Sequence, residues 1–599
     1  MSVMGVVGAL IRSGGDDPIA MAPVTGDGSV GHRSAVGGME RSRRRSPWRS
    51  WDMRMVLVAS ATWAVSLCTH LVGSLISQRW PVGAWTGTLI WVSTAVALAV
   101  SGILVMSILH ARPFLAPTVA LVVVVVMLSA LTTLMQDVDR ALSAGALLSP
   151  GRSRIDPVRM TFTGLVEVSS SRGADCQVAV MVRGAGSSST YRRMALPALA
   201  FGDDAACERM ASGATVDAVV DARASPLGGD EPWLTMENAD SIVVIAEPSG
   251  FARWKAALYD DFFGVCQRLS DQGRMLVPGL SLGLLGAERY DADDQGALDL
   301  AYVDYVREGF SHAGIMHLMA VSGGHFILIT GAIHGVCRRV RSPRWLTGLI
   351  SAVGCAVLAA VMAPSDSVAR ALIMGVWSSG WMVLGRRPRS LVALSWTVII
   401  SIIVDPSMSR SYGFSLSCAA VLGIVLFADG WRERLASVMG KSISAALSMT
   451  LAAQMATAPI QVLLEPEIPL MAPIANLIVA PIVGVSTIAG LTAFALSPVL
   501  PLLAYWCAVA ASWGTAVMEA AATSSLSVPH SILPWLPSPW GSAALVLTYV
   551  VVAVMAAAWR GRAARRRAMS GPGRAFHRSP LSRLRRWTTE TKNIVERLW

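Results

Sequence analysis

The segment Phe114–Met135 reads FLAPTVALVVVVVMLSALTTLM and holds no charged residue. A helix that crosses the hydrocarbon core of a membrane needs about 20 largely apolar residues, so this segment predicts a transmembrane helix. Two similar segments precede it, Met55–Ile76 and Trp85–Leu109, and near-continuous apolar sequence runs from Ala313 to Trp559. We therefore predict an α-helical polytopic integral membrane protein of about 12 spans, with three spans before a polar gap and the others after it.

The arginines predict how these spans are oriented. Short cytoplasmic loops accumulate Lys and Arg, and Arg-rich stretches precede Met55 and follow Trp559. Both ends are expected in the cytoplasm, as a disordered basic tail over residues 1–54 and a basic tail over 561–599. Residues 55–136 would hold the three N-terminal spans, and the polar gap would lie outside the cell. The net charge of +11 also fits nucleic-acid binding, but orientation accounts for most of the excess.

Residues 149–249 carry short β-rich runs in place of long apolar ones. The runs are RMTFTGLVEV, CQVAVMV, RRMALPALAF, ATVDAVVDA and DSIVVIAE, separated by Gly, Ser and Asp clusters. Five strands at this spacing predict a small closed barrel, an extracellular OB-like β-domain. Such a fold binds single-stranded nucleic acid in some proteins, but residues 150–250 hold nine Arg against thirteen Asp plus Glu. A structural or docking role therefore stays open beside direct contact with DNA.

Two of the eight cysteines, Cys176 and Cys207, lie in this predicted β-domain. An oxidising exterior lets cysteines pair, so we predict a Cys176–Cys207 disulfide. Spacing alone does not establish the pairing, and two buried free thiols are the alternative.

Residues 250–311 are predicted to form an amphipathic or re-entrant connecting segment, and residues 312–560 the main transmembrane domain. Polar groups at bilayer depth are costly and usually face the bundle interior or water. The first polar motif of this domain, GIMHLMAVSGGHFILITG, holds His317, Ser322, Gly323, Gly324 and His325. Because Gly is unfavourable in helix interiors, we predict a helix broken in its middle that exposes backbone and imidazole groups to a conduit. Plain close packing of small residues is the alternative.

Three further motifs place polar residues in later spans. PSDSVARALIM puts Arg370 about one turn into a span, and DPSMSRSYGFSLSCAAVLG puts Asp405 at the outer mouth of a span that carries Ser415. AAQMATAPIQVLLEPEIPLMAPIANLIVAPIVG holds Gln454, Asn476 and three helix-distorting prolines. Interrupted membrane helices commonly border a permeation path, so we expect these residues to line or shape one.

The motifs HLMAVSGGH, ARALIM, DPSMSRSYGFSLSCAAVLG and TAPIQVLLEPEIPLMAPIANLIVAPIVG, in this order, closely resemble the ComEC competence family of membrane DNA-uptake channels. The resemblance runs from about Val277 to Ala504, and the β-domain sits where that family has its OB-like domain. Gly324 departs from the family's usual leucine. Many members also carry a C-terminal metallo-β-lactamase-like domain, whereas this sequence has no His-x-His-x-Asp-His run that would hold two metals.

The resemblance implies a channel that imports single-stranded DNA across the cytoplasmic membrane during natural transformation, without a catalytic residue, metal or cofactor. The residues expected to line or shape it are His317, Ser322, Gly323, Gly324, His325, Arg370, Asp405, Ser415, Gln454 and Asn476. The implied partners are membrane lipid, an extracellular DNA receptor, a cytoplasmic helicase-like ATPase and a separate nuclease, and homo-oligomerisation is left open. The chain would not supply the energy itself, because the run Gly440–Ser442 has Leu435 where a P-loop needs glycine.

Two other functions remain as alternatives. Broken helices and intramembrane charges also fit a secondary transporter of a small solute. A membrane-embedded serine hydrolase would use Ser322 as nucleophile and a nearby histidine as base. His325 lies only three residues further along the same predicted helix, where the geometry for proton transfer is poor.

Overall fold

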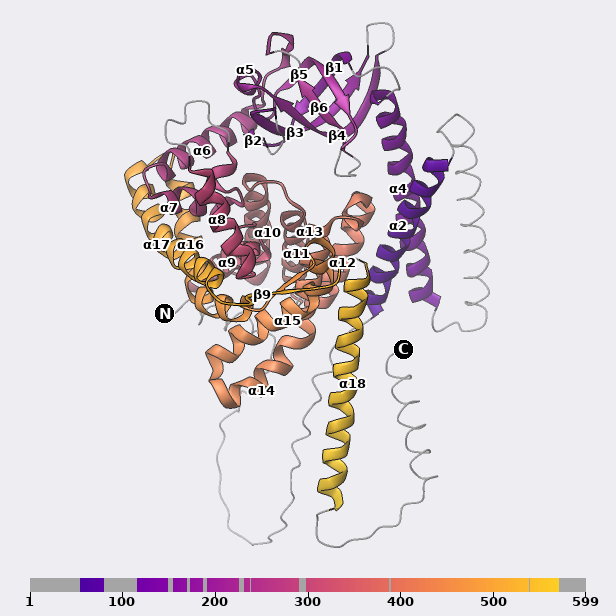
Figure 1. Cartoon of the computed structure of the whole chain (residues 1–599), viewed down its shortest axis with the longest axis vertical. Coiled ribbons are helices and arrows are strands. Elements are labelled where there is room, and N and C mark those ends of the chain that lie inside the picture. Colours follow the sequence, from indigo (N-terminus) through magenta and orange to yellow (C-terminus); the bar gives the residue numbers. More distant parts are fainter. Residues whose placement is uncertain are drawn as a thin grey trace, which may run out of the picture.

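The computed structural model describes residues 54–79, 116–148, 154–169, 173–186, 191–225, 231–236, 239–289, 298–386, 389–537 and 539–569. Its helices form a body that carries a β-domain at one end (Figure 1). Helix α4 (Ala116–Leu147) leads into the β-domain and helix α6 (Gly250–Cys266) leaves it. Residues 1–53, 570–599 and the predicted span Trp85–Leu109 lie outside the described residues.

The N-terminal helices α2 (Arg54–Arg79) and α4 pack along each other through small polar side chains. Ser66 Oγ and Thr133 Oγ1, one from each helix and both fully buried, are 3.0 Å apart. Helix α4 has 32 residues, more than the roughly 20 that a span requires. Its last turn therefore reaches the β-domain, where Leu147 is buried in the core.

Five strands close the barrel of the β-domain, in the order β1-β3-β4-β6-β5 with β5 returning to β1. The β4–β6 pairing is parallel and the other four are antiparallel, which gives a Greek-key barrel of the OB type. The bounds are β1 (Arg154–Phe162), β2 (Glu167–Val168), β3 (Cys176–Ala185), β4 (Arg192–Gly202), β5 (Thr215–Arg223), β6 (Trp233–Met236) and β7 (Val243–Ala246).

The predicted barrel is confirmed, but its fifth strand is not the predicted one. Of the run DSIVVIAE, only Val243–Ala246 form a strand, β7, which among the described residues pairs with β5 alone and whose four residues are all exposed. The ring is closed by β6, which has four residues and follows Pro232. So short a run has little periodicity to recognise in the sequence.

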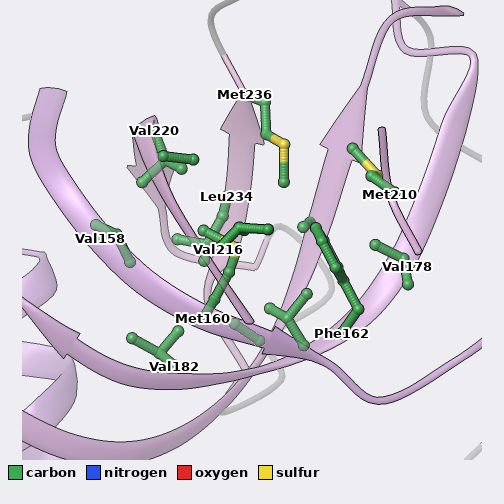
Figure 2. Close-up of a cluster of buried hydrophobic side chains, with 14 of the residues drawn as sticks. Val158, Met160, Phe162, Val178, Val182, Met210, Val216, Val220, Leu234 and Met236 are labelled. Carbon is green, nitrogen blue, oxygen red and sulfur yellow. The ribbon is translucent and has the colours of Figure 1, made fainter. Parts of the chain in front are cut away.

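Alternating side chains fill the barrel (Figure 2). Val158, Met160 and Phe162 of β1 point inward, and Val216 and Val220 of β5 meet them. This period of two is what the predicted strand runs displayed. Beside this core, Cys176 at the start of β3 and Cys207 at the end of the short helix α5 (Asp204–Cys207) are joined as a disulfide, with 1.96 Å between the sulfur atoms.

The fold class is confirmed: this is a polytopic membrane protein with an inserted five-stranded closed barrel. Eight helices among the described residues are long and apolar enough to cross a membrane, and Ser390–Val404 is a shorter apolar helix. The C-terminal helices are α9 (Gly323–Arg339), α10 (Arg344–Val361), α11 (Asp366–Val383), α12 (Ser390–Val404), α13 (Tyr412–Gly423), α14 (Asp429–Met439), α15 (Lys441–Leu464), α16 (Ala472–Leu496), α17 (Pro501–Leu526) and α18 (Trp540–Met569). A π-helical turn, η7 (Ile424–Ala428), joins α13 to α14, and the strands β8 (Glu467–Pro469) and β9 (Ile532–Pro534) pair with each other.

The segment between the barrel and α9 folds into α6, α7 (Asp271–Leu282) and α8 (Leu300–His312). Helix α6 covers the end of α10: Lys255 Nζ donates to the backbone oxygen of Met362 over 2.9 Å, and the Tyr259 hydroxyl to that of Val361 over 2.8 Å. These bonds satisfy carbonyl groups that a helix end leaves open. Helix α7 is buried over most of its length against α16 and α17, so it dips into the body instead of lying on its surface.

Candidate functional site

Two helix ends meet inside the helical body. Helix α7 stops at Gly283, whose φ of 80° lies in the left-handed region that favours glycine. His325, in the first turn of α9, reaches back across this point, and its Nε2 lies 2.9 Å from the backbone oxygen of Leu280. The C-terminal end of one helix thus adjoins the N-terminal end of another. Discontinuous helices of this kind border substrate sites in membrane transporters.

Ser322 begins a helix instead of interrupting one. The sequence prediction placed Ser322, Gly323 and Gly324 inside a span, but the residues before them form a loop and the short 3₁₀ turn η5 (Met316–Leu318), which contains His317. Ser322 Oγ accepts a hydrogen bond from the Gly324 N–H over 3.2 Å. A serine here satisfies a donor that a helix start leaves free, so α9 begins at this residue.

Both ring nitrogens of His325 are occupied. Nδ1 accepts from the backbone N–H of Ser322 over 3.3 Å, so Nε2 carries the proton and donates to Leu280. Neither nitrogen is free to take a proton from Ser322 Oγ, which itself serves as the cap of α9. This geometry gives no support to the serine hydrolase alternative.

Arg370 lies beside the start of α9. Its side chain, on the second turn of α11, is only 4% exposed. The Nε donates to Ser417 Oγ over 2.6 Å, and Nη1 lies 3.9 Å from Met374 Sδ. A β-carbon on Gly323 would stand 3.3 Å from Nη2, so the guanidinium packs against the first residue of α9.

No ion pair joins Arg370 to a carboxylate in the part of the chain that the structure describes. A buried cation without a counter-ion is costly, and the N-terminal end of a helix carries positive partial charge that adds to it. The buried guanidinium of Arg370 and the N-terminal end of α9 together make the space between them favourable for an anion and unfavourable for a cationic ligand.

The other predicted residues have contacts of their own. Gln454 donates to the backbone oxygen of Pro469 over 3.2 Å, which ties α15 to β8. Ser415 and Asn476 each donate to the backbone oxygen four residues earlier, in the first turns of α13 and α16. None of these three hydrogen bonds reaches Arg370.

Asp405 fastens α12 to α4. It accepts from Gln136 Nε2 over 3.0 Å and from the Ser407 backbone N–H over 3.1 Å. Burial alone would raise the pKa of this carboxyl, but the hydrogen bonds from Gln136 and Ser407, with the nearby Arg140, lower it overall. Asp405 therefore acts as an ionised anchor between the N-terminal helices and the start of η6 (Pro406–Ser409).

A buried polar network beside Asp405 was not predicted. His70 Nδ1 lies 2.8 Å from Asp137 and its Nε2 3.1 Å from the backbone oxygen of Pro406. Trp63 Nε1 donates to the backbone oxygen of Ser409 over 2.9 Å. The available signal was a histidine and an aspartate, 67 residues apart, in and beside predicted spans. The backbone partners of His70 and Trp63 lie more than 330 residues away in sequence.

The apolar helices and the inserted barrel define a multi-pass membrane protein. Inside its helical body, the start of α9 and the Arg370 guanidinium form a site that favours an anion. Residues 302–563 match the family model described as Competence protein. The match begins later than the motif resemblance from about Val277 and extends beyond Ala504 into α18. No curated protein and no solved structure matches the chain.

Proposed function

We propose that the chain is the channel through which single-stranded DNA is imported across the cytoplasmic membrane during natural transformation. The observation that carries this proposal is Arg370, buried without a carboxylate partner among the described residues, at the start of α9. The match of residues 302–563 to the competence-family model also supports the proposal. The channel would have DNA as its substrate and no catalytic step of its own.

Electrostatics explain why these groups suit a polyanion. A bare phosphate in hydrocarbon is prohibitively costly, so a conducting path must supply donors and positive charge. A helix N-terminus offers backbone N–H groups and partial positive charge, and a guanidinium matches a phosphate in shape and charge. Each phosphate of the strand would meet the α9 start and Arg370 in turn.

We further propose that DNA first contacts the barrel. Arg159 of β1 pairs in register with Gly184 of β3, which pairs with Arg193 of β4, so basic residues lie in one row across three strands. The Tyr191 ring covers Gly184, and the Arg159 guanidinium, which is paired with Asp217, lies 5.6 Å from the centre of that ring. Arginine beside an aromatic ring is typical of surfaces that bind single strands.

The orientation follows from the arginine-rich loops: both termini in the cytoplasm and the barrel outside. In this arrangement an external receptor would deliver DNA, a cytoplasmic helicase-like ATPase would pull the strand, and a separate nuclease would remove its complement.

The decisive experiment deletes the gene in frame and scores binding of external marker DNA separately from its uptake. Uptake should be lost while binding persists, and re-expression of the intact chain should restore it. Re-expressed Arg370→Gln should lower transformation about 10- to 150-fold, the effect of losing a buried charged contact of about 1.5–3 kcal/mol. Arg434→Gln, at an exposed position on α14, is the matched control. Unchanged uptake after deletion would refute the channel proposal.

A small-solute transporter is the second candidate, because the meeting of α7 and α9 end to end also suits a solute with a carboxylate. Purified chain in sealed vesicles would separate the two. Accumulation of a specific organic anion, together with unchanged transformation in the deletion strain, would favour the transporter.

A further inference from the structure

An apolar cavity lies beside the contact between helix α2 and helices α12, α13 and α15. Its volume is about 750 Å³, and its walls come from α2, α12, the segment Ser409–Arg410, α13 and the end of α15. Protein interiors are packed with few voids larger than a water molecule, and a cavity of about 150 Å³ already holds a benzene molecule. The space is partly open to its surroundings and is large enough to admit a ligand from outside.

The walls call for an apolar occupant. Most lining residues are aliphatic or aromatic, such as Val56, Leu67, Leu394 and Leu463. Three of the four serine hydroxyls that line it bond to their own helices or turns: Ser395 to Leu391, Ser409 to Pro406 and Ser415 to Ser411. These groups offer a ligand little polar contact, so neither a nucleic-acid strand nor a column of water suits the interior of the cavity.

One end of the cavity is polar. Arg410 and Tyr412 line it where α13 begins, and both are exposed. From Leu67 to Val56 the cavity follows α2 for eleven residues, about 16 Å at 1.5 Å per residue. That is close to half of the roughly 30 Å hydrocarbon core, the depth of one leaflet. Tyrosine is enriched at the membrane surface, and arginine is a strong phosphate ligand.

We propose that this cavity is a phospholipid site: one acyl chain fills the space between α2, α12, α13 and α15, and the lipid phosphate lies at Arg410. The lipid completes the packing between the N-terminal helix pair and α13, where Trp63 and Ser409 already make direct contact. The site is independent of the channel function, because it concerns how two parts of the chain are joined and not what passes through them.

The test uses the purified full chain in nanodiscs containing phosphatidylglycerol with a photoactivatable diazirine in its acyl chain. We expect the label on α2 and α13 peptides that line the cavity. Ala59→Leu and Ala419→Leu, two variants that fill it from opposite walls, should each lose this labelling. Ala64→Leu, on the exposed side of the same helix α2, should keep it. Because there are two cavity-filling variants, the test remains valid if one of them misfolds.

A second arm tests the headgroup. Arg410→Gln should weaken the preference for anionic phosphatidylglycerol over zwitterionic phosphatidylethanolamine in competition labelling, and Arg434→Gln should not. Labelling spread evenly over the lipid-facing helices and equal in all three alanine variants would overturn the proposal. So would a photoactivatable oligonucleotide that labels the same α2 and α13 residues, which would assign the cavity to the DNA path.

Discussion

The Arg370 guanidinium packs against Gly323, the first residue of α9, so closely that a β-carbon at Gly323 would stand 3.3 Å from Nη2. The two residues are 47 positions apart in sequence and come from different helices. Their contact is what places positive charge at the start of α9, and it can be disturbed without removing the charge.

Gly323→Ala should therefore impair uptake while leaving the chain folded, because the added methyl group displaces the guanidinium. Gly335→Ala is the matched control on the same helix, since a β-carbon there meets nothing within 4 Å. That control should gain stability of about 0.5–1 kcal/mol from the reduced freedom of the unfolded chain. Transformation frequency, normalised to the amount of protein in the membrane, measures both. Equal uptake by the two variants would contradict the role given to this contact.

Basic residues on the barrel predict a salt-dependent contact with DNA. Arg192→Gln combined with Arg193→Gln should weaken binding of an oligonucleotide to the purified chain. The slope of log affinity against log salt should fall by about 1.4, because each phosphate that a cation neutralises on a single strand contributes about 0.7 to it. Arg209→Gln, at an arginine paired with Asp240 on the barrel, should leave the slope unchanged. A slope that stays constant in the double variant would assign the barrel a docking role only.

Glu167 predicts a specific dependence of stability on pH. Burial raises the pKa of this carboxyl above its ordinary value of 4.5; a hydrogen bond with Gln177 opposes the rise and the neighbouring Glu288 adds to it. The folded protein holds the proton of Glu167 more tightly than the unfolded chain does. The stabilisation from this proton is therefore complete below pH 4.5 and is lost as the pH rises through the raised pKa of the folded state. Glu167→Gln should therefore raise the melting temperature at pH 7 and not at pH 4. A parallel pH profile for the variant and the parent would contradict this assignment.

The disulfide gives a prediction about labelling in cells. Cys176 and Cys207 should resist a maleimide in the denatured, non-reduced chain and react after reduction, whereas the unpaired Cys68 should react in both conditions. Replacing both by serine should destabilise the barrel by about 2–5 kcal/mol. Quantitative mass spectrometry of labelled peptides distinguishes this from two free thiols, which would react without reductant.

Hydropathy was enough to predict a polytopic membrane protein, and strand alternation was enough to predict a barrel and four of its five strands, because both patterns are local. Ser322 shows where local patterns fail: apolar residues continue on both sides of it, so the sequence does not distinguish a loop before α9 from a weak point within one helix. The depth of Arg370 is predictable, but its partners Ser417 and Gly323 come from other helices. The polar start of helix α7 predicts a surface or partly inserted segment. The deep burial of its remaining residues could not be predicted from that pattern.

Helix α4 has one more consequence. At 1.5 Å per residue its 32 residues form a rod about 48 Å long. Its far end is embedded in the barrel through Leu147, and nearer its middle Gln136 and Asp137 hold Asp405 and, through His70, Pro406. Helix α4 therefore joins the barrel core directly to η6, the turn that leads into α13. The barrel is thus connected through α4, η6 and α13 to Ser417, the residue that accepts a hydrogen bond from Arg370.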